Sequence, residues 1–250
     1  MTSGHNNPVG DGQLFGATSL LAPKWTAWLK ELIRERSVRG AESGVTRWAE
    51  NQVKKLGLRS ERIEFDVEKL EALPGVQQPI SPNLGRFNIV GVRPGRQGQR
   101  SLILNAHLDV VPEGDPADWT SPPFTPRIDP GSNLIFGRGA MDDKAGVVIA
   151  LGVIDLLNHF GIELQGSLQV QLVLEDETTG NGSLLCLTNG PKADAAFIID
   201  GTRANRAISQ HAGNVQFGLQ LRGKPASVSV SHMGINAIET LAELILHLRK

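Results

Sequence analysis

Residues 101–111 read SLILNAHLDVV, an apolar run that ends in a histidine and an aspartate. Such a run predicts a strand that is buried on both faces of a mainly parallel sheet. His107 and Asp109 come at the end of this strand, where α/β proteins bind their ligands. The stretch therefore predicts an α/β fold with a polar site at the carboxyl edge of its sheet.

The sequence on both sides of this run alternates strands with helices. A mobile arm is expected at residues 1–20, followed by a helix that Pro23 opens. The remaining expected elements are strands at 87–92, 167–174 and 195–199 and helices at 141–160 and 182–188. Strands that alternate with helices argue for a layered α/β fold.

The pattern changes after Gly213. Residues 215–221 (VQFGLQL) alternate apolar and polar side chains, which predicts an antiparallel strand with one wet face, and a helix is expected at 236–250. One strand and one helix cannot bury their own apolar faces. We therefore expect one domain at 21–212 and, at 213–250, the beginning of a second domain that is cut short or completed elsewhere.

Composition excludes several classes of protein. The 250 residues have a net charge of −1, so no basic surface for nucleic acid or an acidic membrane is expected. The apolar runs are too short to span a membrane. The N-terminus, MTSGHNNPVGDGQLFG, has no pattern of a secretory signal. A single cysteine fits a reducing compartment, and we expect a cytoplasmic protein.

Acidic and histidine side chains follow four of the expected strands and loops. The clusters are His107 with Asp109, Asp142 with Asp143, residues 175–177 (EDE), and Asp200. So many carboxylates cannot share a dry site unless cations neutralise them. Imidazole and carboxylate ligands together suit Zn, Co, Mn or non-haem Fe rather than Ca. Two such ions would acidify a water and polarise a carbonyl oxygen.

Each cluster also has an ordinary structural interpretation. A double aspartate before a helix is commonly an N-cap, and three acids at a strand end are commonly solvated. Asp200-Gly201 alone is typical of a turn. Only the combination of all four at strand ends favours a metal site. A serine or cysteine hydrolase is disfavoured, because Cys186 lies in an apolar helical run and no nucleophile adjoins a base.

The ordered motifs resemble the M20 metallopeptidase family, and most of all its acetylornithine deacetylase and succinyl-diaminopimelate desuccinylase branch. They are HLDVVPEGDPADWTSPPF at 107–124, GRGAMDDKAG at 137–146, EDETTGNGS at 175–183, the DG at 200–201, and RGKPAS with GINAIE at 222–239. The resemblance implies a three-layer α/β/α zinc-aminopeptidase-like catalytic domain with an inserted α+β lid domain that often mediates homodimerisation. It implies hydrolysis of amide bonds in N-acyl amino acids or small peptides.

The resemblance also implies a role for each motif residue. The metal ligands would be His107, Asp142, Glu177 and Asp200. Asp142 would bridge two ions, and a cis peptide bond would join it to Asp143. Asp109 would orient the imidazole of His107. The two divalent ions would be Zn, with Co or Mn as alternatives.

Asp176 stands where the family has a glutamate as general base. Its side chain is shorter by one methylene, about 1.5 Å of reach. Glu175 could replace it only if it faced inward, and in an extended strand it points the opposite way. The expected base is therefore Asp176.

Two further departures concern the lid and the second metal. Ser227 stands where the family has a histidine that stabilises the oxyanion, so His232 or His211 would have to take that role. The family's other metal also takes a histidine near the C-terminus of a longer chain. The sequence therefore predicts an N-terminal fragment of such an enzyme. The alternative function is a catalytically silent remnant that binds metal or ligand at most.

Overall fold

The computed structural model describes residues 9–77, 85–96, 98–200, 206–210, 213 and 217–249. The chain divides into two compact units, Met1–Ala204 and Asn205–Lys250. This division lies earlier in the chain than the domain boundary expected at residue 212.

A five-stranded mixed sheet forms the centre of the first unit. Its order is β1-β2-β6-β3-β7. The strands are β1 (Arg59–Glu64), β2 (Phe87–Arg93), β3 (Leu102–His107), β6 (Leu168–Val173) and β7 (Ala195–Ile198). β3 pairs in parallel with both β6 and β7, whereas β2 is antiparallel to β6 and to β1. The apolar run therefore lies in the parallel part of the sheet, as its composition predicts.

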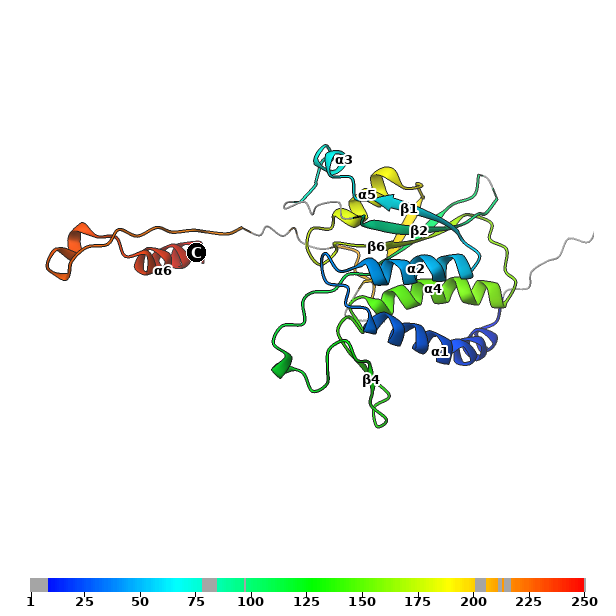
Figure 1. Ribbon diagram of the computed structural model, residues 1–250. Coiled ribbons are helices and arrows are strands. Elements are labelled where there is room, and N and C mark those ends of the chain that lie inside the picture. Colours follow the sequence, from blue (N-terminus) through cyan, green and yellow to red (C-terminus); the bar gives the residue numbers. More distant parts are fainter. Residues whose placement is uncertain are drawn as a thin grey trace, which may run out of the picture. The chain divides into compact units, whose positions relative to one another are not determined.

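Helices cover both faces of this sheet, which confirms the α/β fold (Figure 1). The helices α1 (Asp11–Arg34), α2 (Ser43–Lys55) and α4 (Lys144–His159) lie on one face. Their apolar side chains join those of β3 and β6 in one large core. On the other face, Cys186 of α5 (Asn181–Asn189) packs with Val90, Val92 and Val173. Cys186 is thus a core residue, as expected.

The N-terminal arm expected at 1–20 is wrong for residues 11–20, which form the first turns of α1. Pro23 lies inside this helix rather than at its start. Pro23 is exposed, and so is Ser19, whose carbonyl oxygen loses its helical N–H donor there. That oxygen can bond to water instead, so the proline does not end the helix.

Short elements complete the first unit. They are α3 (Val67–Glu71), the 3-10 turn η1 (Pro116–Asp118) and a small sheet of β4 (Arg127–Ile128) with β5 (Ile135–Phe136). In the five-stranded sheet, β7 is the edge strand next to β3, and its four residues are all exposed.

The second unit contains a 3-10 segment, η2 (Val228–Met233), and helix α6 (Ala237–Leu248). An antiparallel bridge joins Lys224 to Ile235. The strand expected at 215–221 is wrong for residues 217–221, which have no regular structure and no partner strand in the described part of this unit. In the described ranges of the chain, no helix combines the length and apolar character that crossing a membrane requires.

Candidate metal centre

The parallel strands β3, β6 and β7 deliver acidic side chains to one edge of the sheet. His107 is the last residue of β3, Asp176 and Glu177 follow β6, and Asp200 follows β7. Ligand atoms of His107, Asp176 and Asp200 all lie within 4.8 Å of one another. A second group within the same distance consists of His107, Asp142 and Glu177. The convergence expected from the sequence is therefore present.

The His107 imidazole is the shared member of both groups and is only 2% exposed. Its Nε2 lies 3.0 Å from Asp142 Oδ1 and 3.9 Å from Asp176 Oδ2. Its Nδ1 lies 3.0 Å from the backbone oxygen of Asp109, to which it can donate. This contact orients the ring so that Nε2 faces the carboxylates, which is the arrangement that a metal-binding histidine needs.

Electrostatics in the cluster reflect its crowded carboxylates. Burial lowers the pKa of His107, but the hydrogen bond and charge of Asp109, with the charges of Asp176 and Asp143, outweigh burial and raise it to about 10. The pKa of Asp176 is raised by burial and then by Asp109 and other carboxylates. The pKa of Glu177 is raised by burial and then by Asp142. Without a cation, the imidazole is the positive charge that these carboxylates face.

The two aspartates before α4 lie in different surroundings. Asp143 is the N-cap of α4: its Oδ1 accepts from the N–H of Gly146 at 3.1 Å, and its Oδ2 accepts from the N–H of His107 at 3.0 Å. Burial raises the pKa of Asp143 to about 8, with smaller influences from His107 and nearby acids. The peptide bond between Asp142 and Asp143 is cis, and the side chain of Asp142 is half-exposed in the cluster. Asp143 therefore has the N-cap role, whereas the metal-ligand role of Asp142 stays a prediction.

Asp109 supports the loop that follows β6. Its two carboxylate oxygens accept from the backbone N–H groups of Asp176 and Glu177, each at 3.2 Å. Glu175 is buried and accepts from Arg86 Nη1 and Thr179 Oγ1, so it belongs to neither ligand group. The structure thus places Asp176, and not Glu175, with the histidine.

Two of the sequence-predicted residues belong to the second unit. His211 lies outside the described residues. His232 lies in η2 of the second unit and is exposed. The role expected for either side chain at the oxyanion stays a prediction.

Sequence reasoning misses Asn88 of β2 and Arg86, which immediately precedes β2; both contact the loop of Asp176 and Glu177. One signal marks them in the sequence. They are polar residues at the start of an otherwise apolar strand, FNIVGV, and a buried polar side chain requires a partner.

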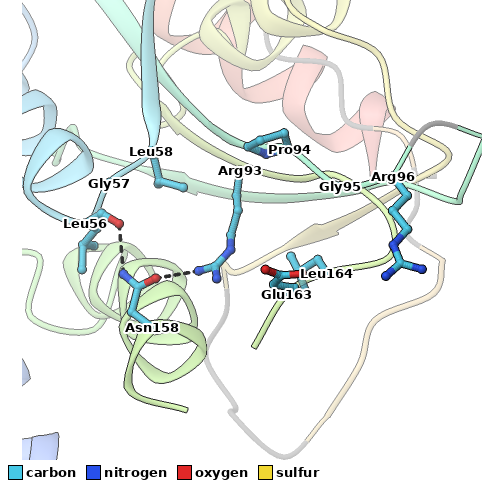
Figure 2. Close-up of a pocket in the computed structure, with 10 residues that line it drawn as sticks. All are labelled: Leu56, Gly57, Leu58, Arg93, Pro94, Gly95, Arg96, Asn158, Glu163 and Leu164. Carbon is cyan, nitrogen blue, oxygen red and sulfur yellow. Dashed lines mark hydrogen bonds between the residues drawn. The ribbon is translucent and has the colours of Figure 1, made fainter. Parts of the chain in front are cut away.

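The cavity drawn in Figure 2 is separate from the acid cluster. It has a volume of about 500 Å³ and lies at the C-terminal end of α4. Arg93 donates there to Asn158 Oδ1 at 2.7 Å and to the backbone oxygen of Ile162 at 2.6 Å. The guanidinium thus satisfies acceptors beside the helix end, which is a structural role.

Comparisons with known proteins identify the family of this chain. The sequence profile of peptidase family M20/M25/M40 matches residues 103–248. A probable succinyl-diaminopimelate desuccinylase of Staphylococcus epidermidis is 31% identical over 150 residues, which are 59% of this chain and 36% of that protein. An N-formyl-4-amino-5-aminomethyl-2-methylpyrimidine deformylase of Halalkalibacterium halodurans is 36% identical over 115 residues, 45% of this chain and 26% of that protein.

Solved structures show the same fold. A tripeptidase of Staphylococcus aureus superposes with a TM-score of 0.63 at 20% identity, covering 89% of this chain and 55% of that one. A dipeptidase of Saccharomyces cerevisiae gives 0.61 at 22% identity, covering 75% and 40%. The chain spans about a quarter to about half of the length of the curated relatives it matches. The profile match covers more than half of the chain, and the chain belongs to peptidase family M20/M25/M40.

Proposed function

We propose that this protein is a metal-dependent hydrolase of amide bonds in N-acyl amino acids or small peptides. The observation that carries the proposal is the gathering of one imidazole and four carboxylates, from the ends of β3, β6 and β7 and from the start of α4, into groups within 4.8 Å. The names of its relatives, a desuccinylase and a deformylase, support acyl groups on nitrogen as the substrate class.

The side chains in the cluster fit divalent cations. His107, Asp142, Glu177 and Asp200 supply the nitrogen and oxygen donors that Zn²⁺ accepts, with Co²⁺ or Mn²⁺ as alternatives. The raised pKa values of Asp176 and Glu177 indicate a repulsion that cations would relieve. We propose two such ions, which these four residues would hold. When bound, such ions acidify a water molecule and polarise the scissile carbonyl.

Asp176 acts as the general base. Its carboxylate takes a proton from the attacking water, whose oxygen adds to the amide carbonyl carbon. The same carboxyl group then gives the proton to the departing nitrogen as the C–N bond breaks. Its carboxylate lies within the cluster, with Oδ2 3.9 Å from Nε2 of His107. Asp109 does not react and keeps His107 and the loop of Asp176 in place.

The second unit is proposed to begin the lid domain. Its bridge at Lys224 and Ile235 and its helix α6 follow the motifs RGKPAS and GINAIE of the family resemblance. A homodimer through this domain is part of the proposal. So is a histidine of this part of the chain, His232 or His211, at the oxyanion.

The test is metal content and turnover of the full chain. Purified protein should hold close to two divalent ions and hydrolyse N-acetyl or N-succinyl amino acids. A chelator should abolish turnover, and Zn²⁺ should restore it. Asp142→Ala should remove turnover, whereas Asp129→Asn, in the exposed turn between β4 and β5, should not. Full activity of metal-free protein would refute the proposal.

A second candidate is a catalytically silent metal-binding protein. It is favoured by the sharing of one imidazole, that of His107, between both ligand groups of the described residues, and by Asp176 in place of glutamate. Metal binding without turnover of any N-acyl amino acid or peptide in the panel would support it. Turnover that Asp142→Ala abolishes would rule it out.

A further inference from the structure

Residues 174–182, here called the acid loop, run from the end of β6 into the first turn of α5 and carry Asp176 and Glu177. The start of β2 holds both ends of this loop through one side chain. The Oδ1 of Asn88 accepts from the N–H of Leu174 at 2.9 Å, and its Nδ2 donates to the carbonyl oxygen of Gly182 at 2.9 Å. Asn88 is fully buried. A Cβ on Gly182 would lie 1.9 Å from the Leu174 oxygen, so the two ends are already in contact.

Arg86 holds the same loop at its first acid. Its Nη1 donates to Glu175 Oε1 at 2.5 Å, and its Nη2 donates to Glu42 Oε1. The guanidinium lies 5.0 Å from the ring centre of Phe65. Arg86 is 7% exposed, and both carboxylates are 2% exposed or less. This is a buried cation between two buried anions.

Glu175 links this ion pair to the backbone conformation of the acid loop. Its φ of 65° turns the chain out of the strand. Its carbonyl oxygen accepts from the N–H of Thr179 at 3.0 Å and of Gly180 at 2.8 Å, and its Oε2 accepts from Thr179 Oγ1 at 2.8 Å. The next two peptide groups, those of Asp176 and Glu177, point their N–H groups at Asp109. The orientation of Glu175 therefore sets where both functional carboxylates lie.

Stability alone is a poor explanation for these polar groups. Replacing a buried ion pair by packed apolar residues is often neutral or stabilising. An apolar residue at position 86 could complete the core around Phe65. The side chain of Asn88 contacts Leu174, Gly182 and Cys186, whereas that of Arg86 contacts Glu175 of the acid loop on one side and Glu42 and Phe65 on the other.

We propose that Arg86 and Asn88 form a clamp that positions Asp176 and Glu177, and that both are positioning residues of the metal centre. The clamp rests on the proposed function, because its purpose is to place a metal ligand beside a general base. Neither side chain belongs to the ligand groups. Each acts through the backbone of the acid loop.

The test compares Arg86→Lys and Asn88→Ala with Arg62→Lys in the full chain. Arg62 is the control, because like Arg86 it donates to a glutamate, here Glu50, and lies beside a phenylalanine ring, 4.3 Å from that of Phe87. Three readouts are used: Zn²⁺ affinity by competition titration, the visible absorption of bound Co²⁺, and amide hydrogen exchange of the acid loop without metal. Circular dichroism confirms that each variant is folded.

Both clamp variants should bind Zn²⁺ roughly 10–100-fold more weakly and change the Co²⁺ spectrum, as loss of supporting contacts does at metal sites. Amides of Asp176 and Glu177 should exchange faster while those of the β2–β6 ladder do not. Arg62→Lys should leave all three readouts unchanged. If Asn88→Ala does not fold, Arg86→Lys carries the test.

Folded clamp variants with wild-type Zn²⁺ affinity and Co²⁺ spectrum would overturn the clamp. A wild-type chain that binds metal but hydrolyses no substrate refutes the hydrolase and leaves the clamp to be judged by affinity. A wild-type chain that binds no metal refutes the proposed function. Hydrogen exchange then decides: unchanged exchange of Asp176 and Glu177 in Arg86→Lys overturns the clamp, and faster exchange supports it.

Discussion

Asp109 joins the two halves of the site through three acceptor atoms. Its backbone oxygen lies 3.0 Å from Nδ1 of His107, and its carboxylate oxygens accept from the N–H groups of Asp176 and Glu177. A carboxylate is suited to this place because both of its oxygens accept and neither donates. The residue therefore fixes an imidazole from β3 relative to carboxylates that follow β6.

Asp109→Asn should weaken metal binding although the side chain keeps its shape. One carboxylate oxygen becomes an NH₂ group, which then faces a backbone N–H of Asp176 or Glu177. We expect Zn²⁺ affinity to fall about 10–100-fold, and unfolding free energy to fall by about 1–3 kcal/mol for the unpaired donor. Competition titration and urea unfolding measure the two effects. Asp129→Asn is the surface control, and equal effects from both variants would contradict the role of Asp109.

Substitutions at the neighbouring residues 176 and 177 should distinguish loss of the catalytic step from loss of metal binding. Asp176→Asn removes the proposed base and should lower kcat by about 10²–10⁴-fold with little change in Zn²⁺ affinity. Glu177→Gln removes a charged ligand and should weaken Zn²⁺ binding first. The measurements are kcat at saturating Zn²⁺ and Zn²⁺ affinity for both variants. The reverse pattern would exchange the two assignments.

At the scale of elements, β1 shows why some strands escape prediction. Its sequence, RSERIE, carries four charged residues of six and lies at the edge of the sheet. The partly buried Ile63 is its one large apolar side chain, so no hydrophobic pattern announces it. Ion pairs help to attach it instead: Arg62 of β1 forks onto Glu50 of α2, at 3.1 and 2.7 Å.

The ion pairs of Glu50 with Arg62 and Lys54 make the unfolding free energy depend on pH. Hydrogen bonds from Arg62 and Lys54 lower the pKa of Glu50 from 4.5 to about 2. A lowered carboxyl pKa means that the stabilisation is fully present above pH 4.5 and is lost as the pH falls towards 2. Arg62 and Lys54 are about half exposed, so we expect only about 1 kcal/mol.

Glu50→Gln should therefore lower the unfolding free energy by about 1 kcal/mol at pH 7, and the difference should shrink between pH 4.5 and pH 3. Urea unfolding at several pH values measures it. Glu61→Gln, which disrupts an exposed pair with Arg59, is the matched control and should have little effect. A difference that stays constant down to pH 3 would contradict the assignment.

At the scale of the whole molecule, the sequence predicts the central strands and the convergence of the acidic side chains, but it does not predict the contacts that hold those side chains in place. The run at 101–111 is apolar and the strand at 167–174 alternates, and these two patterns reveal β3 and β6, which are buried in the sheet. Convergence of the acids follows from parallel strands ending at one edge. The clamp by Arg86 and Asn88 joins β2 to residues far along the chain, and no local pattern encodes that contact. The predicted start of α1 was wrong for a similar reason, because Pro23 is tolerated inside a helix only where solvent replaces its missing hydrogen bond.

Metal should stabilise the whole first unit, because the cluster places like charges together in the folded state only. Burial and neighbouring carboxylates raise the pKa values of Asp176 and Glu177, so these groups oppose folding at neutral pH when no cation is present. An ion that binds only the folded chain adds about 2.7 kcal/mol at a concentration 100 times its Kd. Melting curves with Zn²⁺ and with chelator should therefore differ by several degrees.

His107→Ala is the informative control for this shift. It removes the one imidazole common to both ligand groups, so Zn²⁺ should no longer raise its Tm. Asp155→Asn alters a carboxylate that pairs with Lys24 and Trp25 away from the cluster, so its Tm should still rise with Zn²⁺. Equal Zn²⁺ shifts in His107→Ala and the wild type would mean that the ion binds elsewhere. The carboxylates at the sheet edge would then have to be neutralised by protons and by the imidazolium of His107 alone.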